Sequence, residues 1–183
     1  MTRRETILEA ALDALEAEGE ATIEGVRRRS GASVGSIYHH FGGKDGILAA
    51  LYAETLRGYQ AGVLRALDRA TDAEAGIKAL VRHHLRWVER NPERARFLLY
   101  GGVAGEQASE ELKGLNEGMF AAVGDWVERQ GTIRPLRHEV FYATVFGPAQ
   151  ELSRSWLAGR IKSLRRLEGE LAEAAWRAVR SDA

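Results

Sequence analysis

A run of small, polar and aromatic side chains at residues 33–41, Ser-Val-Gly-Ser-Ile-Tyr-His-His-Phe, is the part of this sequence best suited to contacting another molecule. If the run is helical, its isoleucine and its final phenylalanine share one face. The outer face then carries small residues first and Tyr38, His39 and His40 further on. Hydroxyl groups and ring nitrogens of this kind bond to phosphates and base edges, which a helix tip without bulk can approach closely.

Two short helices joined by a turn are predicted to position these side chains. Thr22 is a good N-cap for a first helix that ends at Ser30-Gly31, where glycine permits a tight turn. Ser33 can cap the second helix, which Gly42-Gly43 ends. Residues 22–41 therefore fit a helix-turn-helix, whose second helix has the right diameter for the major groove of DNA.

The rest of the chain shows apolar residues recurring three and four positions apart, with only three prolines among 183 residues. This pattern predicts an all-α protein of about nine helices. We expect an N-terminal three-helix domain at residues 1–48 and a C-terminal helical bundle at residues 49–183. One long helix is predicted at residues 138–159, with a kink at Gly147-Pro148 because proline removes one backbone hydrogen bond.

Composition narrows the class of protein. There is no cysteine, which excludes disulfides, thiolate metal sites and cysteine nucleophiles and fits a reducing cytoplasm. No apolar run long enough for a signal peptide or a membrane span is present, so we expect a soluble cytoplasmic protein without a membrane partner. The 26 basic and 26 acidic residues balance, so any nucleic-acid surface must be local.

The sequence gives little indication of an enzyme active site or of a metal site. The sequence contains neither an HExxH motif nor a P-loop, so we expect no catalytic residues, no cofactor and no enzymatic activity. His83 and His84 are adjacent, but neighbours in a helix point in different directions and no further ligand follows at a spacing of four. We interpret both as polar groups of the surface or of a pocket and expect no metal.

Residues 7–48 resemble the DNA-binding domain of the TetR-type (tetracycline-repressor) family of transcriptional regulators. The resemblance lies in Thr22-Ile-Glu24, Arg28-Arg-Ser-Gly31, Ser33–Phe41 and Lys44-Asp-Gly-Ile-Leu48. The Gly-Ser-Ile-Tyr-x-His-Phe core, followed by lysine and an apolar pair, is more restrictive than a bare helix-turn-helix pattern. It implies a ligand-responsive regulator, most commonly a repressor, that binds a palindromic operator as a homodimer and is released by a small-molecule effector.

The resemblance also implies roles for single residues. Val34, Gly35 and Ser36 would face bases, and His39 would be the variable, sequence-reading position. The remaining candidates would contact the phosphate backbone or the flank of the site: Thr22, Arg28, Tyr38, His40 and Lys44.

Two features depart from the family pattern. Arg27 stands where the family usually has a small alanine between the two helices; its side chain could extend outward, splay the helices or reach DNA. Residues 1–50 hold six basic groups against eight acidic ones, which predicts modest and strongly salt-limited DNA affinity. Residues 22–50 alone hold four basic groups against two acidic ones, so the local field still favours DNA.

The resemblance further implies that residues 49–183 form a ligand-binding and dimerisation domain. Its aromatic residues are candidates for lining an effector cavity, although ordinary core packing explains most of them. This effector set is Trp87, Phe97, Tyr100, Phe120, Trp126, Phe141 and Tyr142. Apolar stripes at residues 141–157 and 164–178 suit either a dimer interface or an intramolecular core. The candidate dimer set is Phe146, Leu152, Trp156, Leu167, Leu171 and Ala175.

An alternative function remains open: a helical ligand-binding module that has lost DNA binding. Arg27 and the acidic first helix motivate it. DNA binding at low salt distinguishes this alternative from the regulator.

Overall fold

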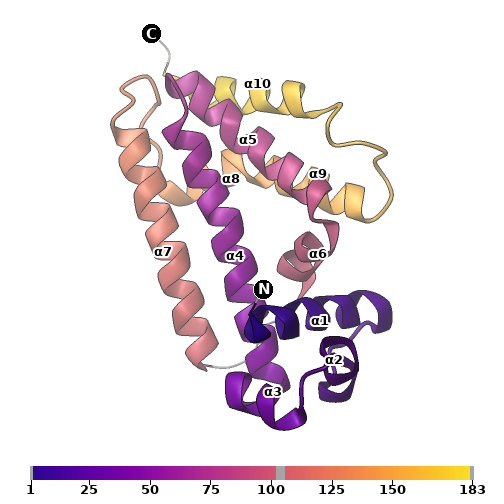
Figure 1. The fold of residues 1–183 in the computed structure, drawn as a ribbon. Helices are drawn as coiled ribbons and strands as arrows, with labels where there is room; N and C mark the ends of the chain where they lie inside the picture. Colours follow the sequence, from indigo (N-terminus) through magenta and orange to yellow (C-terminus); the bar gives the residue numbers. More distant parts are fainter. Residues whose placement is uncertain (1, 102–105, 182–183) are drawn as a thin grey trace. The chain divides into compact units, whose positions relative to one another are not determined.

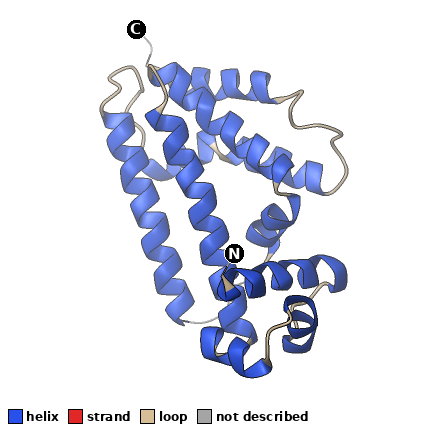
Figure 2. Ribbon diagram, viewed as in Figure 1, coloured by secondary structure: helices blue, strands red, loops and turns tan. Residues whose placement is uncertain are grey.

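The computed structural model describes residues 2–101 and 106–181, which fold into helices joined by loops (Figure 1). The predicted all-α fold is confirmed, and Figure 2 shows helices and loops throughout the described part of the chain. No helix of that part is long and apolar enough to cross a membrane. The helices are α1 (Arg3–Glu18), α2 (Ile23–Ser30), α3 (Val34–Phe41), α4 (Lys44–Asp68), α5 (Ala73–Arg90), α6 (Pro92–Tyr100), α7 (Glu106–Glu128), α8 (His138–Val145), α9 (Gly147–Leu157) and α10 (Glu168–Val179).

The long helix predicted at residues 138–159 is divided into α8 and α9 at Gly147-Pro148. Proline has no backbone N–H to donate to the preceding turn, and here it stands in the first turn of α9, a position that it tolerates. This break accounts for the tenth helix among the described residues, where about nine were expected. The last helix begins at Glu168, four residues later than its apolar pattern indicated.

The chain divides into two compact units. Unit 1 comprises Met1–Arg57 and Glu93–Gly114, and unit 2 comprises Gly58–Pro92 and Leu115–Ala183. The first unit therefore includes α1, α2, α3 and α6, whereas α5, α8, α9 and α10 belong to the second.

Unit 1 is built around a core to which α1, α2, α3 and the first part of α4 contribute. Leu8 of α1, Val26 of α2, Ile37 of α3 and Ile47 of α4 are all at most 1% exposed.

Local hydrogen bonds determine where α1 begins. The Thr2 hydroxyl accepts a hydrogen bond from the Glu5 amide at 3.2 Å, and the Glu5 carboxylate accepts one from the Thr2 amide at 2.7 Å. This reciprocal capping box satisfies two otherwise unpaired donors.

In unit 2, α5 lies alongside α10 (Figure 1). The apolar stripe predicted for α5 is buried, with Leu80, Val81 and Leu85 fully inaccessible. Ion pairs fasten the same two helices at their surface, because Lys78 donates to Glu173 at 2.6 Å and Arg86 donates to both oxygens of Glu168. Hydrophobic burial and a bidentate ion pair therefore both stabilise the contact between α5 and α10.

A chain of buried polar groups connects three helices of unit 2. The Ser153 hydroxyl of α9 donates to the Ala149 carbonyl at 2.8 Å, so its oxygen accepts from Nε2 of His84 at 3.2 Å. The Tyr59 hydroxyl of α4 then donates to Nδ1 of His84 at 2.8 Å. Burial raises the pKa of Tyr59 and so keeps its proton in place. His84 is thereby fixed as the neutral tautomer protonated on Nε2.

Burial of His84, reinforced by the nearby charges of His83 and Arg154, lowers its pKa from 6.5 to about 4. Because the folded state resists the proton that the unfolded state accepts, stability is full above about pH 6.5 and is lost as the pH falls toward 4. We expect a loss of about 3 kcal/mol over this window, from 1.36 kcal/mol per pKa unit.

Urea denaturation between pH 7 and pH 4 tests this expectation. The His84→Gln variant, which cannot take up the proton, is the control and should lose distinctly less stability over the same window. Equal pH dependence in the two proteins would show that His84 is not the responsible group.

Candidate nucleic-acid interface

The predicted helix-turn-helix is present as α2, a three-residue turn and α3. Thr22 caps α2 by accepting a hydrogen bond from the Gly25 amide at 3.0 Å. The helix ends at Gly31, whose φ of +63° is strained for residues other than glycine and whose amide donates to the Arg27 carbonyl. Ser33 then caps α3 by accepting from the Ser36 amide at 3.1 Å. The caps predicted from the sequence therefore set both helix boundaries.

The α3 helix turns Ile37 and, in part, Phe41 toward the core and presents most of its other side chains to solvent. Ile37 is the buried residue of this helix, and Ser36 is half-buried. Val34 and Tyr38 are 44% and 52% exposed, which is unusual for side chains of their size. The exposed candidates on this one short helix are Val34, Gly35, Tyr38, His39 and His40.

A close approach of the backbone determines where α4 starts. Gly42 ends α3 with φ +71°, and Lys44 is the first residue of α4. A Cβ atom at Gly46 would lie only 1.7 Å from the Phe41 carbonyl oxygen, so only glycine fits there. Its residue type and spacing had not indicated this role. It allows α4 to begin directly after α3 and thereby holds Lys44 next to the end of α3.

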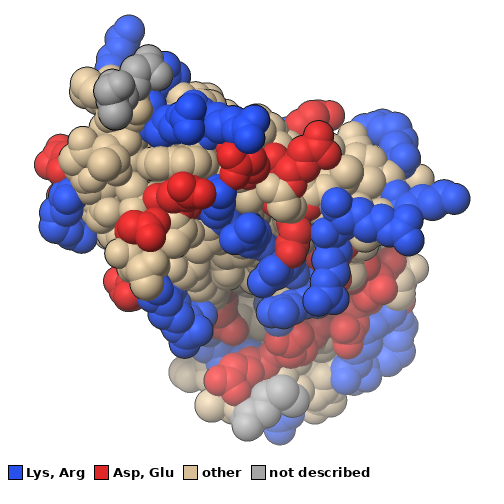
Figure 3. Space-filling model, turned by 90° about the horizontal axis from the view of Figure 1, so that it is seen from above, with Lys and Arg blue, Asp and Glu red and all other residues tan. Residues whose placement is uncertain are grey.

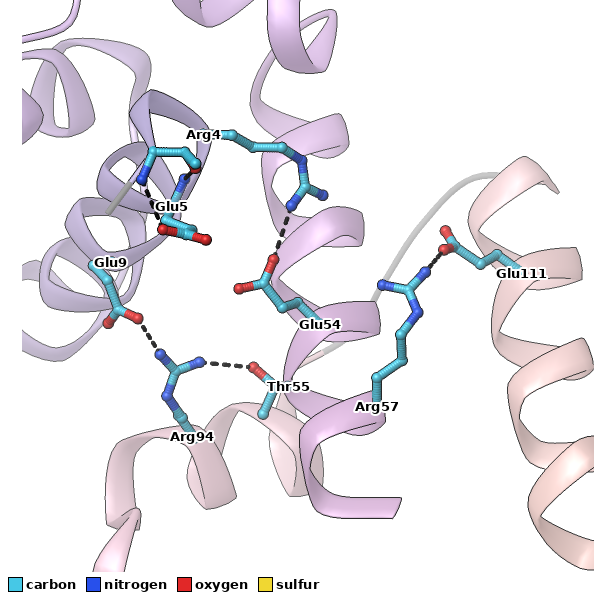
Figure 4. Close-up of polar contacts among 9 residues, drawn as sticks. Arg4, Glu5, Glu9, Glu54, Thr55, Arg57, Arg94 and Glu111 are labelled. Carbon is cyan, nitrogen blue, oxygen red and sulfur yellow. Dashed lines mark hydrogen bonds and ion pairs between the residues drawn. The ribbon is translucent and has the colours of Figure 1, made fainter. Parts of the chain in front are cut away.

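Ion pairs within unit 1 hold α1 against α4 and α6 (Figure 4). Arg4 of α1 donates to Glu54 of α4 at 2.8 Å. Arg94 of α6 donates both to Glu9 of α1 and to the buried Thr55 hydroxyl of α4, the latter at 3.2 Å. Since α1 packs on α2, these pairs fix the support on which the helix-turn-helix rests.

Arg27 extends outward instead of separating the two helices. Its guanidinium donates to both carboxylate oxygens of Glu24, each at 2.7 Å, and its side chain is 46% exposed. The outward orientation that the sequence analysis considered for this residue is therefore the one adopted. Buried Gly25 and Val26 take the inward positions of α2.

On the face drawn in Figure 3, basic and acidic side chains are interspersed. This agrees with the zero net charge of the chain and leaves DNA attraction to local groups.

A cavity of about 130 Å³ lies in unit 2 between α7, α8 and the loop that joins them. Phe120, Phe141 and Tyr142 of the effector set line it, together with residues outside that set, among them Phe146 of the candidate dimer set. The Phe120 ring packs edge-on against His138 and Tyr142, at centroid distances of 4.7 and 5.4 Å. The additional lining residues are Met119, Val123, Gly124, Val127, Glu128, Arg134, Leu136, His138 and Phe146.

The other members of the effector set lie elsewhere. Trp126 is buried with its ring directly over Gly76, where a Cβ atom would lie 2.2 Å from the indole. Trp87 packs on Tyr59 with ring centroids 5.0 Å apart. Phe97 and Tyr100 belong to unit 1 and line an open groove beside α1. Helix packing determines where each of these aromatic side chains lies, and residue type alone does not indicate it.

The candidate dimer set is divided by burial. Phe146 and Ala175 are buried within the chain, at 2% and 5% exposure. The half-buried members, which retain accessible surface, are Leu152, Trp156, Leu167 and Leu171.

Two further patterns in the sequence have structural explanations. The interpretation of His84 as a polar group of the surface or of a pocket is wrong, because it is the buried, hydrogen-bonded histidine described above. Across residues 2–101 and 106–181 no group of three candidate metal ligands is found. The letters of Gly31-Ala-Ser-Val-Gly35 also fit the G-x-S-x-G pattern of hydrolases, which requires a nucleophile between a strand and a helix. Here Ser33 lies between two helices and caps the second of them.

Comparisons with known proteins place this geometry in context. Residues 7–51 match the family "Bacterial regulatory proteins, tetR family". The chain is 41% identical over 56 residues to the HTH-type transcriptional regulator BetI 2 of Chromohalobacter salexigens, covering 30% of this chain and 27% of that protein. It is 36% identical over 83 residues to the HTH-type transcriptional regulator BetI of Klebsiella pneumoniae, covering 43% of each. The matched segments thus span less than half of these relatives.

The fold resembles that of solved structures over nearly its whole length. The transcriptional regulator FadR from Bacillus subtilis, solved in complex with stearoyl-CoA, superposes with a TM-score of 0.80 at 15% identity, covering 93% of this chain and 96% of that one. At this level of identity the likeness concerns the fold alone.

The close approach at Gly46 predicts an asymmetric response of two glycines of α4. Gly46→Ala should lower the free energy of unfolding by about 1–3 kcal/mol, because the new methyl group forces the α3–α4 turn apart. Gly58→Ala should be neutral or stabilising by up to about 1 kcal/mol, since its Cβ enters open space within the same helix. Chemical denaturation of both variants measures the difference; equal effects would contradict a steric role for Gly46.

Proposed function

We propose that this chain, a member of the tetR family of bacterial regulatory proteins by its residues 7–51, is a transcription regulator that binds double-stranded operator DNA. The observation that carries the proposal is the outer face of α3, where an exposed valine, tyrosine and two histidines stand on a helix capped and packed from behind. A helix of this diameter enters the major groove, where bases are distinguishable.

On this proposal, the beginning of α3 reads bases and its end binds phosphates. Val34, Gly35 and Ser36 approach base edges, since none of them is bulky enough to keep the helix away. His39 contributes a further base contact. Tyr38 and His40, one turn from the tip, donate to phosphate oxygens.

Residues at neighbouring helix ends fix the register on the duplex. The Thr22 hydroxyl oxygen accepts from Gly25, which leaves its proton available to a phosphate. Lys44 and the start of α4 bind a second phosphate, because a helix N-terminus is electropositive. Arg28 adds a contact at the flank.

The protein acts as a homodimer on a palindromic operator, with its two α3 helices about 34 to 36 Å apart, or a multiple of this, to meet successive major grooves. Leu152, Trp156, Leu167 and Leu171 are suited to contact a second copy, because they keep accessible apolar surface. Phe146 and Ala175 support that face from within. Residues 1–48 form the DNA-binding domain and residues 49–183 the ligand-binding and dimerisation domain.

The effector occupies the aromatic cavity between α7 and α8. A cavity of about 130 Å³ is well below the roughly 300–1,000 Å³ that buries a drug-sized ligand and matches the size that admits a single ring. The effector class is therefore a compact aromatic molecule rather than a long acyl chain. If it prefers the state that cannot bind DNA, it releases the operator and relieves repression.

Selection from a library of random double-stranded DNA tests the DNA-binding proposal. The wild-type protein should enrich a palindrome, and the Tyr38→Ala, Lys44→Ala double variant should not. Lys162→Ala removes an exposed cation of unit 2 and should enrich the same palindrome. Absence of enrichment by a folded wild-type protein at low salt would favour the alternative, a ligand-binding module without DNA activity.

Thermal unfolding with single-ring probes (phenol, benzoate and aniline) tests the cavity. A probe at 100 times its Kd should stabilise the wild-type protein by about 2.7 kcal/mol. Gly124→Leu, which fills the cavity, should abolish this stabilisation, whereas Gly118→Leu places the same side chain in open space on the same helix and should preserve it. Equal stabilisation of both variants would contradict this location of the site.

A further inference from the structure

Every basic side chain of residues 22–50 is ion-paired with a carboxylate in the DNA-free protein. Arg28 and Arg29 both donate to Oε1 of Glu18 at 2.8 Å, and Lys44 donates to Glu20 at 3.3 Å. Arg27 is paired with Glu24 of its own helix. The local excess of positive charge that favours DNA is therefore largely neutralised before DNA arrives.

The two acceptors Glu18 and Glu20 flank a single turn. Glu18 is the last residue of α1, and Gly19 ends that helix with φ +76°, so that the chain reverses and Glu20 follows immediately. One carboxylate reaches the end of α2 and the other reaches the start of α4. The turn after α1 thus supplies one carboxylate to Arg28 and one to Lys44, the two side chains that we propose to contact DNA phosphates.

We propose that Glu18 and Glu20 compete with DNA phosphates for Arg28 and Lys44, which makes the turn after α1 an autoinhibitory element of the interface. The inference rests on the proposed DNA-binding function. A carboxylate and a phosphate both accept charge-assisted hydrogen bonds from the same donors, and they repel each other when they share one cation. Each phosphate contact therefore requires an intramolecular ion pair to open.

The two pairs differ in how readily they open. Glu18 is also paired with Arg29, whose side chain is only 22% exposed. Arg28 must therefore break its ion pair with Glu18 while Glu18 remains bound to Arg29. Glu20 is 60% exposed and holds Lys44 through a single long hydrogen bond. Replacing Glu20 therefore tests the competition without removing a partner from a half-buried arginine.

A double-mutant cycle on Glu20 and Lys44 is the decisive experiment. Binding of a 30-base-pair mixed-sequence duplex is measured by fluorescence anisotropy, at a salt concentration low enough for the Lys44→Ala protein to bind. Glu20→Gln should bind roughly two- to five-fold more tightly than wild type, the range expected for releasing one exposed ion pair. The gain should shrink as salt rises and should vanish in the Lys44→Ala background.

Asp13→Asn is the matched control, since it removes one charge from an exposed position of α1 for which the described residues provide no ion-pair partner. It should change affinity less than Glu20→Gln does. A gain that persists in the Lys44→Ala background would reveal general repulsion and overturn the inference, as would weaker binding by Glu20→Gln. If no protein of the cycle binds DNA, the proposed function itself fails and the inference falls with it.

Discussion

Burial of Ile37 is the interaction on which the candidate interface depends. A helix of eight residues is too short to be stable alone, so α3 exists because the core of unit 1 holds it. Ile37 is the one side chain of α3 that is fully inaccessible, and it belongs to the same cluster as Leu8, Val26 and Ile47. Phe41, one turn further on, packs partly buried against the same cluster. Attachment through this one inner face leaves the opposite face free, which is the arrangement that a surface for base edges requires.

Much of this local structure could be predicted from the sequence because it is determined by near neighbours. Thr22 and Ser33 each cap a helix three residues before the amide they accept from, and Gly31 and Gly42 end helices through their own backbone conformation. The break at Gly147-Pro148 has the same local origin. The caps and breaks follow from residue type alone, and the all-α class follows from apolar spacing.

Features that join distant segments could not be predicted in this way. Glu9 and Arg94 are separated by 85 positions, and nothing in the sequence indicates that they pair. Phe97 and Trp126 look alike as apolar aromatics, yet one lies in the core of unit 1 and the other fills the space above Gly76. The steric requirement at Gly46 is set by the Phe41 carbonyl oxygen, which has no signature in residue type. Packing, rather than propensity, determines each of these positions.

The hydrogen bonds from Tyr59 through His84 and Ser153 to Ala149 all point the same way. In a chain of hydrogen bonds with a fixed direction, replacing one side chain leaves its buried neighbour without a hydrogen-bond partner. Replacing the whole set with apolar side chains of the same volume avoids that penalty. The three side-chain positions should therefore change together, rather than one at a time, among relatives of this chain.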